Sequence, residues 1–194
     1  MKRRKFFQVI AATGLASLLA ENSIAAINQP SLRFLRPPGA LGEDDFLSRC
    51  IRCGKCGEAC PNRCIMYFDL ENGMSSMDTP YIIPREQGCI LCMKCGEVCP
   101  SGAIQPYERE MHAILQNVKM GKAVVNQDLC LSYQGKTCGV CYRACPLQDV
   151  AIKVGRLEQP HVQDACVGCG LCERSCIQIP QAIRIIPNHD RKSV

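Results

Sequence analysis

Residues 50–61 read CIRCGKCGEACP, and this stretch decides which fold the chain can adopt. Its four cysteines have the spacing C-x2-C-x2-C-x3-C, which returns twice more along the 194-residue chain. A further group keeps the last two intervals and lengthens the first to seven residues. The four groups are Cys50, Cys53, Cys56 and Cys60; Cys89, Cys92, Cys95 and Cys99; Cys130, Cys138, Cys141 and Cys145; and Cys166, Cys169, Cys172 and Cys176.

This spacing is typical of bacterial-type [4Fe–4S] ligand runs, in which a tight loop supplies three thiolates and the fourth reaches a neighbouring cluster. We therefore predict four [4Fe–4S] clusters with all sixteen of these cysteines as ligands. Disulfides and structural zinc are less favoured alternatives, because zinc sites separate their C-x2-C pairs by longer stretches. The seventeenth cysteine, Cys64, is expected to be a buried or incidental thiol, and a substitute ligand is the less favoured reading. The three histidines, His112, His161 and His189, are assigned to no metal.

The groups begin about 40 residues apart, and each is flanked by short apolar stretches and opens a turn of helix. The chain has no tryptophan and only 5% aromatic residues, so cluster binding should supply much of its folding free energy. The predicted fold is α+β, two tandem bacterial-type two-cluster ferredoxin modules at 46–106 and 122–187. Short strands are expected at 80–84, 103–105, 122–126, 150–154, 160–162 and 182–186.

The segment between the modules, residues 107–121, is predicted to be a connecting helix. Met111, Ile114, Leu115 and Val118 have the spacing of one helical face, and Gly121 is expected to end the helix. An N-terminal segment at 27–45 and a tail at 188–194 complete the expected organisation.

Two pairings of the cysteine groups remain open. Because sequential units usually pack together, we expect the first group to pair with the second and the third with the fourth, with the last cysteines exchanged. The predicted sets are Cys50, Cys53, Cys56 and Cys99; Cys89, Cys92, Cys95 and Cys60; Cys130, Cys138, Cys141 and Cys176; and Cys166, Cys169, Cys172 and Cys145. The alternative is a nested arrangement that pairs the first group with the fourth and brings Cys60 close to Cys176.

Residues 1–26 are expected to be a signal peptide. The paired Arg3 and Arg4 precede an apolar stretch at 9–20 that is short for a membrane span. Paired arginines indicate the twin-arginine route, which exports folded proteins and suits clusters assembled beforehand. We therefore predict a periplasmic protein, with any attachment to the inner membrane through a partner. An ordinary basic terminus on a cytosolic ferredoxin is the less favoured alternative.

The formal net charge of +5 is a poor guide to partners. Residues 1–26 hold four basic residues and one acidic residue, so the remainder of the chain is formally +2. Clusters with four thiolates add negative charge, and no nucleic-acid-binding motif is present, so no nucleic-acid partner is expected.

Several stretches resemble the NapG/MauM ferredoxin-type proteins. They are the leader, residues 36–40 (RPPGA), 100–103 (PSGA), 120–124 (MGKAV), the stretched group at 130–143 and residues 164–170 (DACVGCG). The resemblance implies a periplasmic electron carrier that works with a NapH-like, quinol-oxidising membrane protein and passes electrons to a periplasmic oxidoreductase such as nitrate reductase.

Two classes of function compete. The favoured one is an electron-transfer subunit with no small-molecule substrate of its own, since the chain has no Gly-rich nucleotide loop and every cluster has four candidate ligands. An enzyme is the less favoured class. An accessory or maturation protein for another periplasmic redox enzyme, of the methylamine utilisation type, is the alternative function.

Overall fold

The computed structural model describes residues 34–188. The expected signal peptide with Arg3 and Arg4, the segment up to residue 33, and residues 189–194 with His189 lie outside the described residues. The described residues belong to one compact unit, and no helix among them is long and apolar enough to cross a membrane.

The regular elements of residues 34–188 are short. The helices are α2 (Glu43–Arg49), α3 (Lys55–Glu58), α4 (Lys94–Glu97), α5 (Met111–Asn117), α6 (Val140–Arg143) and α7 (Leu171–Ser175), with 3-10 turns η1 (Leu70–Asn72) and η2 (Arg156–Glu158). The strands are β1 (Met66–Tyr67), β2 (Pro80–Tyr81), β3 (Gly121–Val125), β4 (Ile152–Val154), β5 (Pro160–Val162) and β6 (Ile183–Pro187).

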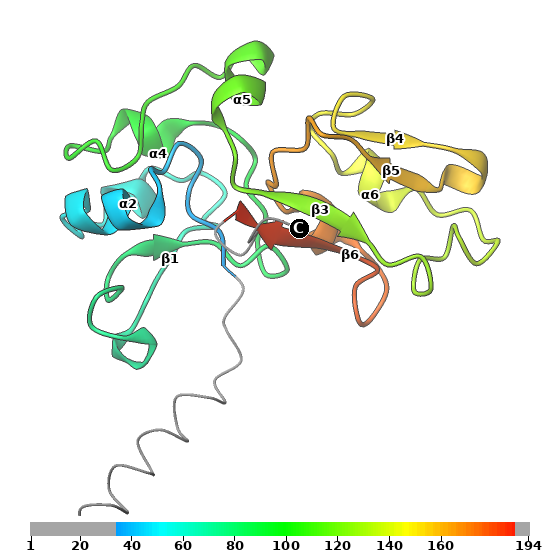
Figure 1. Ribbon diagram of the computed structural model, residues 1–194, viewed down its shortest axis with the longest axis horizontal. Coiled ribbons are helices and arrows are strands. Elements are labelled where there is room, and N and C mark those ends of the chain that lie inside the picture. Colours follow the sequence, from blue (N-terminus) through cyan, green and yellow to red (C-terminus); the bar gives the residue numbers. More distant parts are fainter. Residues whose placement is uncertain (1–33, 189–194) are drawn as a thin grey trace, which may run out of the picture. The chain divides into compact units, whose positions relative to one another are not determined.

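In the second half of the chain, two antiparallel pairs frame the cysteine loops. The first strand of this half, β3, pairs with the last, β6, in a register that joins Gly121 to Pro187 and Val125 to Ile183. Between them in sequence, β4 pairs with β5 as a hairpin. Alternate residues of β6 are buried, as expected for a strand with one face on the core. Figure 1 shows β3 and β6 crossing the centre of the fold, with β4, β5 and α6 on one side of them.

The first half has the same plan with less regular strands. The hairpin is β1 with β2, while the strand expected at 103–105 forms only a bridge between Ala40 and Ile104. The Leu41 N–H donates to the Ala103 carbonyl at 3.1 Å, and the Gln105 N–H donates to the Gly39 carbonyl at 2.8 Å. Gly39 has φ +86°, and a Cβ there would lie 2.5 Å from the Gln105 oxygen. The segment before the first cysteine therefore takes the place that β3 takes in the second half.

The connecting helix is shorter than predicted. α5 ends at Asn117, and Val118 is already extended, so the prediction that Gly121 ends the helix is wrong. Gly121 instead begins β3, where a Cβ would lie 2.6 Å from the Ile186 oxygen. Ile114 and Val118 are buried, whereas Met111, in the first turn, is 52% exposed.

Helix α2 was not predicted. Its first turn holds three acidic residues, which suit the positive end of the helix dipole, and Phe46 is its buried anchor. The main core joins both halves of the chain. Ile82 from the first half, Ile114 and Val118 from the connecting region, and Ile152 and Ile185 from the second half belong to one cluster of buried residues.

Candidate metal centres

The described residues bring sixteen cysteines into four cavities, each lined by three cysteines from one group and one from another. Site I is lined by Cys50, Cys53, Cys56 and Cys99. Site II is lined by Cys60, Cys89, Cys92 and Cys95, together with Cys64. Site III is lined by Cys130, Cys138, Cys141 and Cys176, and site IV by Cys145, Cys166, Cys169 and Cys172. This is the crossed arrangement of the groups, and the nested alternative does not agree with it.

A left-handed residue after the second cysteine of each group turns the loop around its cavity. Gly54, Gly139 and Gly170 have φ of 76°, 57° and 86° and immediately precede α3, α6 and α7. Glycine adopts this conformation without a steric penalty. Met93 takes the same place before α4 with φ 61°. This position could not be predicted, because methionine has no preference for a left-handed conformation.

Backbone N–H groups point at several of the sulfur atoms. The Leu91 N–H donates to Cys89 Sγ at 3.4 Å, and the Ile104 N–H donates to Cys99 Sγ at 3.5 Å. Burial by itself would raise the pKa of Cys99. Hydrogen bonds from the backbone of Ile104, Ser101 and Ala103 and from the Ser101 side chain have the larger effect, so the pKa of this thiol is lowered. Such hydrogen bonds stabilise the thiolate and help to set the potential of a cluster.

Other cysteines are buried strongly enough to stay protonated without iron. Burial, with nearby cysteines adding to it, raises the pKa of Cys95 and of Cys169 to about 12 and that of Cys141 to about 11. Burial also raises the pKa of Cys172 well above its ordinary value. Cluster binding must therefore displace protons from these thiols, so that assembly is coupled to proton release.

The cavities fit iron–sulfur cubes. Three of them measure about 350–370 Å³ and that of site II about 250 Å³, with the solvent at their mouths included. Each offers at least four thiols, one for each iron of a cube, in largely apolar surroundings. No three His, Cys, Asp or Glu side chains within residues 34–188 converge on a single metal ion. His112 contacts Gln116, and His161 packs on the ring of Tyr133.

Sites II and IV meet where the two halves of the chain touch. The Cys89 N–H donates to the Cys169 carbonyl at 2.7 Å, so that one ligand loop is bonded to the other. Small residues allow this approach: a Cβ on Gly88 would lie 2.8 Å from the Leu171 nitrogen, and one on Gly170 would lie 2.8 Å from Pro84 Cβ.

Arg85 reinforces this contact. Its Nη1 atom donates to the carbonyl oxygens of Glu173, Arg174 and Cys176 at 3.1, 3.1 and 2.9 Å. These carbonyls belong to the end of α7, where a helix leaves acceptors without partners and favours positive charge. In the other direction, Arg174 Nε donates to the Glu86 carbonyl at 3.2 Å.

Contacts between the helices of the cysteine loops arrange the four sites in one row. Helices α3 and α4 pack together and bring site I beside site II, and α6 and α7 do the same for sites III and IV. Cys56 of site I lies near enough to Cys95 of site II to raise the pKa of the Cys95 thiol. In the same way, Cys141 of site III raises the pKa of Cys172 of site IV. The spatial order is therefore I, II, IV, III.

The two terminal sites are the less buried ones. Only Cys56 in site I and Cys130 in site III are buried, and Cys53 in site I is exposed. Three of the four expected ligands in site II and two in site IV are buried. Ile51 beside site I is 62% exposed, and Ile177 and Ile179 beside site III are 61% and 87% exposed.

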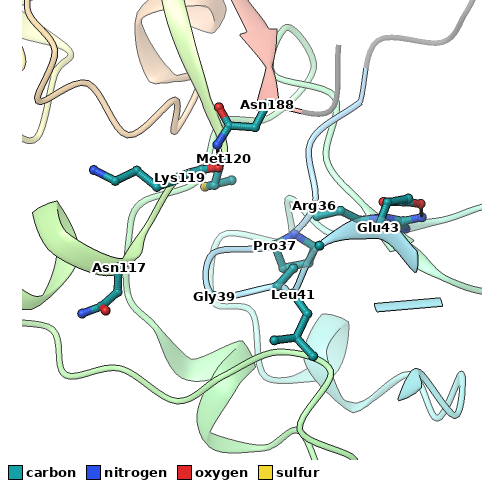
Figure 2. Close-up of a pocket in the computed structure, with 11 residues that line it drawn as sticks. Arg36, Pro37, Gly39, Leu41, Glu43, Asn117, Lys119, Met120 and Asn188 are labelled. Carbon is teal, nitrogen blue, oxygen red and sulfur yellow. Dashed lines mark hydrogen bonds and ion pairs between the residues drawn. The ribbon is translucent and has the colours of Figure 1, made fainter. Parts of the chain in front are cut away.

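A fifth cavity, of about 820 Å³, contains no cysteine. Figure 2 shows it between the segment that carries Arg36 and Glu43 and the residues that lead from α5 into β3. Arg36 is already engaged: it pairs with Glu43, donates to Thr79 and to the Pro80 carbonyl, and lies over the ring of Phe46. The sequence did not single out this arginine as a structural centre, since arginine is rarely buried.

Comparison with known proteins defines the class of protein first. Residues 49–103 and 88–149 each match the family described as the 4Fe-4S dicluster domain. With four cysteine-lined sites, the chain is a ferredoxin-type iron–sulfur protein of tandem dicluster modules that carries four [4Fe–4S] clusters and transfers electrons.

Relatives along nearly the whole chain give the particular family. The methylamine utilization ferredoxin-type protein MauM of Methylorubrum extorquens is 38% identical over 184 residues, covering 90% of this chain and 82% of the relative. The ferredoxin-type protein NapG of Escherichia coli is 38% identical over 204 residues, covering 95% and 85%. NapG of Haemophilus influenzae is 37% identical over 207 residues, covering 96% and 72%. The chain belongs to the NapG and MauM ferredoxin-type proteins.

Proposed function

We propose that the sixteen cysteines of sites I to IV are the cluster ligands and that the protein relays electrons from a NapH-like, quinol-oxidising membrane protein to a periplasmic oxidoreductase such as nitrate reductase. The observation that carries this proposal is the row of four neighbouring sites within one chain, with the more exposed sites at its two ends. The likeness to NapG proteins supports the nitrate reductase assignment. On this proposal the chain, an α+β fold, holds no substrate site of its own.

The electron path follows the spatial order I, II, IV, III. Each transfer then occurs between neighbours, and the contact between Cys89 and Cys169 is the crossing between the two halves. Because transfer rates fall steeply with separation, donor and acceptor dock at the exposed ends, near Ile51 and near Ile177.

The path is testable by magnetic resonance on the fully reduced protein. Spin–spin coupling is expected within the pairs I–II, II–IV and IV–III, and not between I and III. In the variant Cys92→Ala, which damages site II, coupling of site IV with site III should survive while site I becomes isolated. Direct coupling of sites I and III in the wild-type protein would refute this order.

The relay itself is testable in a reconstituted system. Phospholipid vesicles holding the NapH-type protein and a quinol are mixed with nitrate reductase, with and without this protein. Nitrate reduction should require the cluster-loaded protein and should stop with metal-free protein. Equal rates with and without it would exclude the relay.

A second candidate function is a ferredoxin-type accessory role in methylamine utilisation, which the likeness to MauM favours. The same protein would then serve an immature periplasmic enzyme rather than nitrate reductase. Transfer of electrons to a methylamine-oxidising system, with none to nitrate reductase, would decide for this function.

A further inference from the structure

Site II differs from the other three sites in its number of thiols. Its cavity is lined by five cysteines, with Cys64 as the fifth, whereas the cavities of sites I, III and IV are lined by four each. A [4Fe–4S] cube offers four iron corners, so one thiol at site II is in excess.

Cys64 lies beside two of the proposed ligands. Its Sγ is 3.6 Å from Cys60 Sγ, and Cys89 lines the same cavity. The side chain is only 3% exposed, so solvent does not compete for it. A thiol this close to Cys60 would be a neighbour of any iron that Cys60 held.

The backbone holds Cys64 in this place. The turn that separates it from Cys60 is closed by a hydrogen bond from the Arg63 N–H to the Cys60 carbonyl at 3.1 Å. Asn62 fixes the same turn to the opposite ligand loop, since its Nδ2 donates to the Gly88 carbonyl at 2.7 Å and Gln87 Nε2 donates to the Asn62 carbonyl at 3.1 Å. Cys64 is therefore buried, as expected, and it also lines the cavity of site II.

We propose that Cys64 is a reserve ligand of the site II cluster, able to occupy the iron corner that Cys60 holds. This inference rests on the ligand set proposed above. In the exchange, the Cys64 sulfur forms a bond to iron while the Cys60 sulfur–iron bond breaks, and the proton of the Cys64 thiol passes to the released Cys60 thiolate. No electron is gained or lost, so the exchange needs no oxidant.

The test compares Cys60→Ala with a matched control, Cys99→Ala. Cys99 is the corresponding exchanged cysteine of site I, where no fifth cysteine lines the cavity. Anaerobically reconstituted Cys60→Ala should keep the iron and sulfide content of the wild type, with four clusters by native mass spectrometry. Cys99→Ala and the double variant Cys60→Ala/Cys64→Ala should each lose iron from one site. An equal loss of iron in Cys60→Ala and Cys99→Ala would overturn the proposal.

A second measurement decides the matter even if Cys60→Ala fails to fold. Cys64→Ala alone should keep four clusters but release iron from site II to a chelator about tenfold faster than the wild type, with the other three sites unchanged. Identical release rates would count against a reserve ligand. If the wild-type protein itself held fewer than four clusters, the proposed ligand set would fail instead, so the two failures are distinguishable.

Discussion

At the scale of single residues, the position of a cysteine relative to its cavity decides what its loss does. Cys92 and Cys64 both line site II, but only Cys92 is one of the spaced cysteines. The spare thiol, Cys64, lies beside Cys60 and is proposed as a substitute for Cys60 alone.

Replacing Cys92 by alanine should therefore remove between one and about four of roughly sixteen iron atoms, because one iron corner loses its thiolate in a cavity that admits little water. Iron and sulfide analysis of anaerobically purified protein measures this. Cys64→Ala is the matched control and should leave the iron content unchanged. Zinc in place of iron, or a full iron complement in Cys92→Ala, would contradict the ligand assignment.

At the scale of the elements, the contact between the two halves depends on a residue with no side chain. Gly88 needs no positive φ, so its role is purely steric, and an added Cβ would press on backbone atoms of Leu171 and Gly170. Backbone atoms yield less readily than the end of a flexible side chain.

Gly88→Ala should lower the free energy of unfolding by about 1–3 kcal/mol, the usual cost of overpacking, and should slow electron transfer between sites II and IV. Gly42→Ala is the control, because a Cβ on Gly42 meets nothing within 4 Å. Thermal unfolding and reduction kinetics of the two variants provide the comparison. Equal behaviour of both variants would mean that the halves do not meet through Gly88.

The four short helices of the cysteine loops depend on the clusters. Helices α3, α4 and α6 have four residues each and α7 has five, far fewer than the roughly 12–15 that make an isolated helix marginally stable. Each of these helices carries one proposed cluster ligand, in chain order Cys56, Cys95, Cys141 and Cys172.

Removal of iron by a chelator should therefore melt these helices. Hydrogen exchange of the Ala59 and Ala144 amides, which close turns of α3 and α6 at 3.0 Å, should rise to the rates of unstructured chain, and the helical circular dichroism should fall. Return of iron and sulfide under reducing conditions should restore both signals. Protection that persists in metal-free protein would show that packing alone maintains the helices.

At the scale of the whole molecule, the expected location of the protein depends on how its amino terminus is read. The paired Arg3 and Arg4 are expected to direct folded export, which would carry finished clusters out of the cytoplasm. Within residues 34–188, no helix is long and apolar enough to cross a membrane.

The double variant Arg3→Lys/Arg4→Lys should leave cluster-loaded protein in the cytoplasm, because the twin-arginine pathway reads the arginine pair and not the charge alone. Cell fractionation with iron analysis of each fraction measures this. The control Lys2→Arg keeps the pair and should be exported normally. Efficient export of the double variant would exclude the twin-arginine route.

The sequence by itself determined the chemistry of this protein. Sixteen cysteines at repeated spacing predicted four clusters, because the geometry of a cube constrains how a short loop presents its thiolates. It also predicted where most strands lie, since β5 has its expected bounds and β3, β4 and β6 differ only at their ends. These features depend on residues close together in the chain, so the spacing of cysteines and the position of apolar stretches are enough to predict them.

Only the tertiary structure decided how the sites connect. The meeting of sites II and IV depends on Gly88, Gly170 and the contact of Cys89 with Cys169, which lie about 80 residues apart in sequence. The early end of α5 and the role of Gly121 in β3 follow from the approach of β6, a partner distant in sequence. The closeness of Cys64 to Cys60 is likewise a property of the folded turn. The spacing of the cysteines specifies which residues can bind a cluster. The path between clusters depends on which loops pack against each other, and contacts between residues distant in sequence determine that packing.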